Sequence, residues 1–180
     1  MTATMPAGTT LAHLLNASGR KRDSQRSRLY RAETPLPGRR FTTLDECAHY
    51  RDTVVGSLWW AAAFADPELD LAHAPRLRPG QGARSAFFRL EDNGEPTITL
   101  PRRYRTAGVI LHELAHWALW RRVDIALHGP EFARVLLDLT AAFGGDERAA
   151  RLRASYGEHR VKVAAEFPHP SRFAAPPPRG

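Results

Sequence analysis

The segment 109–120 reads VILHELAHWALW and places two histidines and a glutamate in an otherwise apolar run. His112 and His116 are four residues apart, so on an α-helix they lie one turn apart on the same face. A helix that is apolar on almost every side is a buried helix. Unpaired polar side chains in such a helix would be costly, and a bound cation offsets that cost. The segment therefore predicts a buried metal-binding helix around which the chain is organised.

Glu113 follows the first of these histidines and points to a different side of the helix. This is the HExxH pattern of zinc metallopeptidases, in which the histidines bind the metal and the glutamate acts on a water molecule. We therefore expect His112 and His116 to be metal ligands and Glu113 to be the catalytic base. The alternative is a chance match, which the apolar surroundings and a third histidine downstream disfavour.

That third histidine opens the segment 128–132, which reads HGPEF. Pro130 and Glu131 suit the first turn of a second helix, and His128 at its start can turn back to the site as the third ligand. Glu131 competes for that role, but we prefer it as a carboxylate that hydrogen-bonds a ligand or caps the helix. Three imidazoles would hold one Zn²⁺ and leave its fourth position for water.

The cysteine count and the net charge limit the other kinds of zinc site and binding partner that the chain could have. Cys47 is the only cysteine, so the chain has no internal disulfide and no Cys-based zinc module. The formal net charge of +7 favours contact with nucleic acid or another anionic surface. The Arg-rich run 20–31 could be a phosphate-contacting arm. A solvated basic surface explains both features at least as well.

The sequence predicts one domain flanked by two terminal segments. The chain has no run of 18 apolar residues, and its basic residues follow the N-terminal apolar patch, so neither a membrane span nor a signal peptide is expected. We expect a cytoplasmic protein without a membrane partner. Residues 1–21 would be a flexible basic leader, 22–165 the metallohydrolase domain and 166–180 a Pro-rich disordered tail.

Periodic segments around the HExxH stretch predict an α+β fold. A capping box at 43–46 predicts a helix that runs to about Phe64. Residues 27–33 and 76–78 are candidate short strands. Residues 85–90 and 97–100 form a predicted hairpin around an Asn-Gly turn, directly before the metal helix.

The second strand of this hairpin leads towards the metal helix, and such a strand can bind an extended peptide by strand addition. A plain sheet edge is equally compatible with the pattern. The candidate substrate-binding residues are Thr97, Ile98, Thr99 and Leu100.

HELAHW at 112–117 followed by HGPEF at 128–132 resembles the SprT-like zinc metallopeptidases. A closer likeness is to short actinobacterial HExxH metallohydrolases, which share the R-D-x-Q-R start found at 22–26 and the same order of hairpin, HExxH helix and HGPEF. The likeness covers about residues 22–162. It implies a minimal zincin-like (minigluzincin) domain, a small twisted sheet packed on the HExxH helix. The family's zinc ligands would be His112, His116 and His128, with Glu113 as the base.

The sequence differs from SprT-like proteins and from metzincins, and these differences limit the predicted function. SprT-like proteins often carry a Cys-rich zinc module, which a chain with one cysteine lacks, so a DNA-linked role is not implied. Metzincins are excluded because Leu119 and Arg122 stand where their pattern needs Gly and His. The expected substrate is a protein or peptide. A nucleic-acid-binding protein with a structural zinc and a non-peptide amide hydrolase remain the alternatives.

The predicted reaction also needs a donor for the oxyanion that forms on the substrate. Tyr104, Tyr156 or an arginine could serve, and the sequence does not choose among them.

Overall fold

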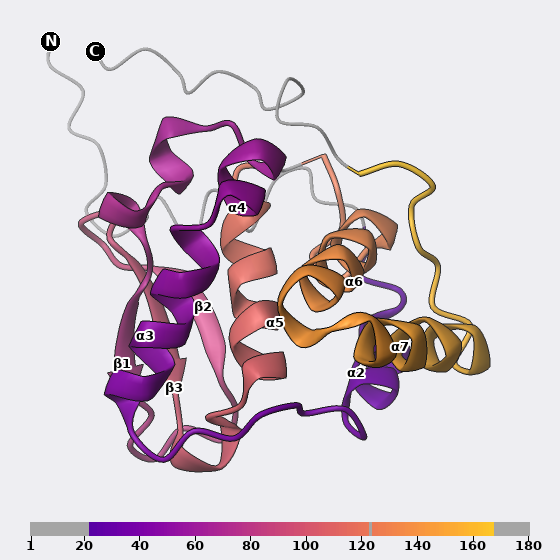
Figure 1. The fold of residues 1–180 in the computed structure, drawn as a ribbon, viewed down its shortest axis with the longest axis horizontal. Helices are drawn as coiled ribbons and strands as arrows, with labels where there is room; N and C mark the ends of the chain where they lie inside the picture. Colours follow the sequence, from indigo (N-terminus) through magenta and orange to yellow (C-terminus); the bar gives the residue numbers. More distant parts are fainter. Residues whose placement is uncertain (1–21, 123, 168–180) are drawn as a thin grey trace, which may run out of the picture.

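The structure is a computed structural model that describes residues 22–122 and 124–167. The predicted leader and residues 168–180 of the predicted tail lie outside this range. The described residues form six α-helices and one three-stranded mixed sheet, which confirms the α+β class (Figure 1). The helices are α2 (Arg26–Glu33), α3 (Leu44–Val55), α4 (Leu58–Ala63), α5 (Ala107–Ala118), α6 (Pro130–Gly144) and α7 (Asp146–Glu158). The strands are β1 (Arg76–Pro79), β2 (Phe87–Leu90) and β3 (Pro96–Leu100).

Strand β3 lies in the middle of the sheet. It pairs in parallel with β1 and antiparallel with β2, which confirms the predicted hairpin. Because both edges of β3 are paired, the expectation that a peptide adds to Thr97, Ile98, Thr99 and Leu100 is wrong. The hairpin strand at a sheet edge is β2.

Helix α5 lies at the centre of the molecule, between the sheet and the C-terminal helices (Figure 1). It packs against β2 and α3 on one side and against α6 on the other, while α2 packs against α7. Thr106 caps α5 by accepting a hydrogen bond from the backbone N–H of Val109. Leu111, Leu114 and Trp117 are buried, as the apolar pattern predicts.

Two predicted elements differ from the structure. Residues 27–33 form part of helix α2 instead of a strand. Leu29 and Ala32, three residues apart, are both buried, and the segment is rich in good helix formers. The helix expected to reach Phe64 is broken at Gly56, and Ser57 caps the short α4 by accepting from the backbone N–H of Trp60.

Two further observations concern the limits of the domain. Phe167, within the stretch predicted as tail, packs against Trp59 and Phe64, so ordered contacts extend past the boundary predicted at residue 165. None of the helices within 22–122 and 124–167 is long and apolar enough to cross a membrane.

Candidate metal centre

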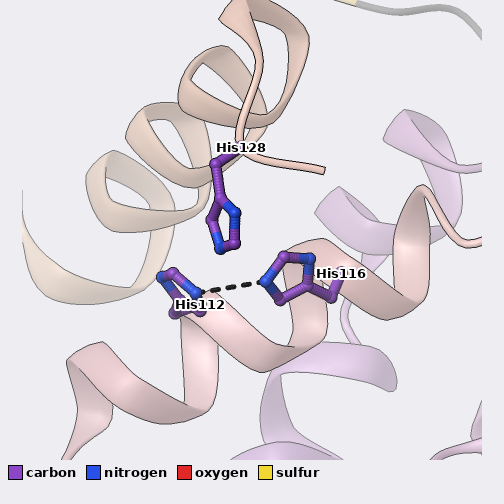
Figure 2. Close-up of side chains that lie close together, drawn as sticks. All are labelled: His112, His116 and His128. Atoms are coloured by element: carbon purple, nitrogen blue, oxygen red, sulfur yellow. Dashed lines mark hydrogen bonds between the residues drawn. The ribbon is translucent and has the colours of Figure 1, made fainter. Parts of the chain in front are cut away.

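The three predicted histidines converge on one point (Figure 2). His112 and His116 project from one face of α5, and His128 lies two residues before α6. Each offers a ring nitrogen, and these nitrogens all lie within 4.8 Å of one another. The arrangement could hold a metal ion.

The spacing of two of these nitrogens suits such an ion. The Nε2 atoms of His112 and His116 are 3.2 Å apart. Two nitrogens bound at 2.0–2.1 Å to a tetrahedral ion lie about 3.3 Å apart. The pair therefore has the separation that a shared cation requires, without movement of the helix.

Two carboxylates that the sequence analysis did not select hold the outer nitrogens of the ligand rings. The Nδ1 atom of His112 lies 2.8 Å from Oε2 of Glu33, at the end of α2. The Nδ1 atom of His128 lies 2.7 Å from Oδ2 of Asp23, just before α2. An ionised carboxylate only accepts hydrogen bonds, so each Nδ1 carries the proton and each Nε2 presents its lone pair. This tautomer is the one that binds a metal through Nε2.

The same contacts set the proton affinities of these rings. Burial lowers the pKa of His112, but the charge and hydrogen bond of Glu33 together with the charge of Glu113 outweigh it, so the net pKa lies above the ordinary value. At His128 burial dominates and lowers the pKa, and Asp23 offsets only part of the effect. Both rings are 4 % exposed, so solvent does little to screen these charges.

Glu113 follows His112 on α5 and is bonded to strand β2. Its Oε2 accepts a hydrogen bond of 2.7 Å from the backbone N–H of Phe88 in β2. The side chain is buried, and burial raises the pKa of its carboxyl group. A raised pKa brings a carboxylate closer to the range in which it can accept and return a proton near neutral pH.

Tyr30 is a further side chain at the centre that the sequence analysis did not select. Its hydroxyl lies 3.2 Å from Nε2 of His128, and its ring stacks on His112 with the centroids 5.4 Å apart. The tyrosines considered from the sequence lie elsewhere. The Tyr104 hydroxyl donates to the carbonyl oxygen of Arg84, and Tyr156 is buried at 1 % exposure.

Glu131 lies in the first turn of α6, as expected for a carboxylate at the helix start, but it does not support a ligand ring. The outer nitrogen of His128 donates to Asp23 instead. The Glu131 carboxylate lies close to Gly129, and its charge contributes to the raised pKa of Arg122. None of the hydrogen bonds among the described residues joins Glu131 to a site histidine.

A cavity of about 810 Å³ opens onto the histidines and Glu113. The floor is α5, one wall is α2 with the residues around it, and the other wall is the stretch 85–90, which includes β2. Tyr30 and Glu33 lie in the first wall, and Phe88 in the second. A substrate in this cavity would contact the candidate ligands, the candidate base and the edge strand together.

Among the residues that the sequence analysis missed, Asp23 alone had a sequence signal. Asp23 belongs to the R-D-x-Q-R segment at 22–26, which the sequence analysis noted only as a point of resemblance. Gln25 of the same segment is buried and fixes it in place, because its side chain exchanges two hydrogen bonds with the backbone of Lys162. The described part of the run that could have been a phosphate-contacting arm, residues 22–31, thus contributes Asp23 and Tyr30 to the candidate metal centre.

Comparisons with known proteins do not assign this site. Searches against protein-family models, curated proteins and solved structures find no match to this chain. The likeness to SprT-like metallopeptidases stays a prediction, and the interpretation of the site rests on its own residues.

Proposed function

We propose that this protein is a zinc-dependent metallohydrolase, and specifically a metallopeptidase. The observation that carries the proposal is the convergence of three histidine nitrogens within 4.8 Å, with Glu113 buried in the adjoining position of the same helix. We further propose that the α+β domain is a minimal zincin-like (minigluzincin) domain of the SprT-like kind.

The donor set supports zinc as the metal. Three neutral imidazoles and an open fourth position are typical of catalytic zinc, whereas structural zinc sites are closed by four protein ligands. His112 and His128 already present Nε2 lone pairs, because their outer nitrogens donate to Glu33 and Asp23. When bound, the ion would lower the pKa of water and polarise the substrate carbonyl.

The remaining chemistry falls to the protein. Glu113 would accept a proton from the attacking water, and the water oxygen would add to the carbonyl carbon. Glu113 would then pass the proton to the leaving amine as the C–N bond breaks. Burial, which raises the pKa of Glu113, favours this two-way transfer.

The cavity wall favours an extended peptide as the substrate. Strand β2 is a sheet edge and lines the cavity beside Glu113. The N–H of Phe88 points away from β3 and towards the site, since it donates to Glu113. Backbone groups on such an edge can pair with an extended peptide.

Two alternatives are less well supported. A nucleic-acid-binding protein with a structural zinc would not need an open cavity or the Glu113 carboxylate. An amide hydrolase for small molecules is compatible with the cavity, since about 810 Å³ falls within the usual range of small-molecule sites. The edge strand along one wall favours the peptide.

Metal analysis of purified protein tests the proposal first. We expect about one zinc per chain in the wild type and in Glu113→Gln, and none in His116→Ala. His73→Ala is the matched control, because His73 is exposed and its ring is bonded to Asp70, away from the three site histidines. A wild type that binds no zinc even when zinc is supplied would contradict the proposal.

The second test measures cleavage of a peptide library. Zinc-loaded wild type should cleave peptides, and Glu113→Gln should lose at least about 100-fold in kcat while it keeps its metal. Equal cleavage by the two proteins would remove Glu113 from the mechanism. Salt-sensitive nucleic-acid binding without hydrolysis of any peptide or amide would favour the structural-zinc alternative.

A further inference from the structure

We infer that Tyr30 is an additional catalytic residue, whose hydroxyl donates a hydrogen bond to the substrate carbonyl oxygen as negative charge develops there. The inference rests on the proposed function and assigns the oxyanion donor of that site. It follows from the position of the hydroxyl, the support of the ring and the location of Glu113.

The hydroxyl is placed by its contact with a candidate ligand. It lies 3.2 Å from Nε2 of His128, the nitrogen that faces the common point of the three rings. Since Nδ1 of His128 donates to Asp23, Nε2 accepts, and the phenol is the donor. If a cation were bound at this nitrogen, the lone pair would no longer be available to Tyr30. The hydroxyl would still accept a hydrogen bond from Arg26, but its own proton would be free to donate to a substrate oxygen.

The ring is held on two sides. It stacks on His112 at 5.4 Å with an interplanar angle of 22°, and it lies tilted against His128 at 5.2 Å. The Arg26 guanidinium carbon is 5.5 Å from the ring centroid. The residue is nevertheless 40 % exposed and lines the cavity. A donor that is fixed in advance and faces the substrate is what stabilisation of an oxyanion requires.

Tyr30 lies in the α2 wall, whereas Glu113 lies on α5 and is hydrogen-bonded to the β2 wall. Helix α2, which carries Tyr30, and strand β2, which binds Glu113 through Phe88, lie on opposite sides of α5 (Figure 1). Glu113 would therefore accept the water proton from the α5 floor, and Tyr30 would donate to the carbonyl oxygen from the α2 wall. Tyr30 keeps its own proton throughout, so the proton balance of the hydrolysis remains with Glu113.

The other three tyrosines do not compete for this role. Their hydroxyls donate to backbone carbonyls or lie in the core: Tyr50 to Phe143, Tyr104 to Arg84, and Tyr156 buried. Tyr104 also lines the cavity, so Tyr104→Phe removes a hydroxyl from the same cavity without touching a histidine. It is the matched control for Tyr30→Phe.

Metal-loaded proteins and acetohydroxamate, an oxygen-donor anion, provide a test that needs no substrate. Zinc affinity would be measured by competition with a chelator, and hydroxamate binding by visible absorption of the cobalt-loaded proteins. Tyr30→Phe should keep zinc affinity within about threefold and weaken hydroxamate binding about 10- to 100-fold, the effect of losing a hydrogen bond to a charged group. Tyr104→Phe should change neither quantity.

The outcomes separate this inference from the proposed function. A wild type that binds no metal contradicts the proposed function itself. If metal binds, equal hydroxamate affinity in Tyr30→Phe and wild type overturns the role of Tyr30, as does a metal-loaded wild type that binds no hydroxamate. A tenfold loss of zinc affinity in Tyr30→Phe also overturns it, because Tyr30 would then be a metal ligand.

Discussion

The two walls beside α5 support its polar residues in different ways. On the α2 side, Glu33 and Asp23 place ionised carboxylates 2.8 and 2.7 Å from the outer nitrogens of His112 and His128. On the β2 side, one neutral backbone N–H lies 2.7 Å from Glu113. The histidines that would bind the ion are thus held by carboxylates, whereas Glu113, the candidate base, is held by an uncharged backbone N–H.

This difference matches what each group has to do. A carboxylate behind an imidazole fixes its tautomer and makes it a more basic ligand. A carboxylate that acts as a base needs a pKa that is raised towards neutrality, and strong ionic support would lower it. Burial with one neutral donor leaves the pKa of Glu113 raised. The α2 wall should therefore govern metal affinity, and the β2 wall should not.

The largest expected effect comes from removing the carboxylates of the α2 wall. Glu33→Ala and Asp23→Ala should each lower zinc affinity by about 10- to 100-fold, the usual result of losing a carboxylate that supports a metal-bound histidine. Glu33→Gln should lose less, because its amide oxygen can still accept from Nδ1 of His112. Competition with a chelator at fixed pH measures all three affinities.

An exposed carboxylate provides the control for this series. Glu147 pairs with Arg151 on α7, and its side chain is 80 % exposed. Glu147→Ala should leave zinc affinity unchanged. If Glu33→Ala and Asp23→Ala behave like this control, the carboxylates do not support the ligands and the contrast between the walls is wrong.

A smaller effect is expected on the β2 wall. Phe88→Pro removes the N–H that donates a hydrogen bond to Glu113. Because this N–H points away from β3, the hydrogen bonds between β2 and β3 can persist. Loss of a hydrogen bond to a buried carboxylate should lower the free energy of unfolding of the metal-free protein by about 1.5–3 kcal/mol. Zinc affinity should stay within about threefold of the wild type. Urea unfolding and chelator competition measure the two quantities.

Phe88→Leu serves as the reference, because it changes the side chain but keeps the N–H. The prediction fails if Phe88→Pro is as stable as Phe88→Leu. A loss of zinc affinity as large as that of Glu33→Ala would show that the β2 wall also governs metal binding.

The sequence predicted those parts of the site that lie in helix α5 or in the segments next to it along the chain. The i, i+4 spacing placed His112 and His116 correctly because helical periodicity fixes their relation. The hairpin before α5 was also predicted, since its strands and Asn-Gly turn are local signals. His128 joins the other two histidines, as the HGPEF segment suggested.

The α2 wall could not be predicted in the same way. Glu33 and Asp23 are 79 and 105 residues from the histidines that they contact, and no local pattern encodes a tertiary contact of that range. The charge-rich segment also resembled a solvated arm. The order of strands was missed for a similar reason: β1 pairs with the side of β3 that faces away from β2, so β3 is central and β2 is the hairpin strand at an edge.

The smallest expected effect concerns a hydroxyl behind α2. Tyr156 on α7 is 1 % exposed, its hydroxyl has no hydrogen-bond partner among the described residues, and burial raises its pKa well above the ordinary value. Tyr156→Phe should leave zinc affinity unchanged and raise the free energy of unfolding by up to about 1 kcal/mol, because an unsatisfied buried polar group is removed.

The stability of the wild type should also depend on pH at this residue. The neutral phenol is the form favoured in the folded state, so the wild type should lose stability as pH rises above about 10, where the unfolded chain ionises. The variant lacks this loss, and urea unfolding at pH 7 and pH 10.5 should show its advantage growing with pH. A variant less stable than the wild type at both pH values would mean that the hydroxyl has a hydrogen-bond partner and that the α2 side of the site contains a further polar contact.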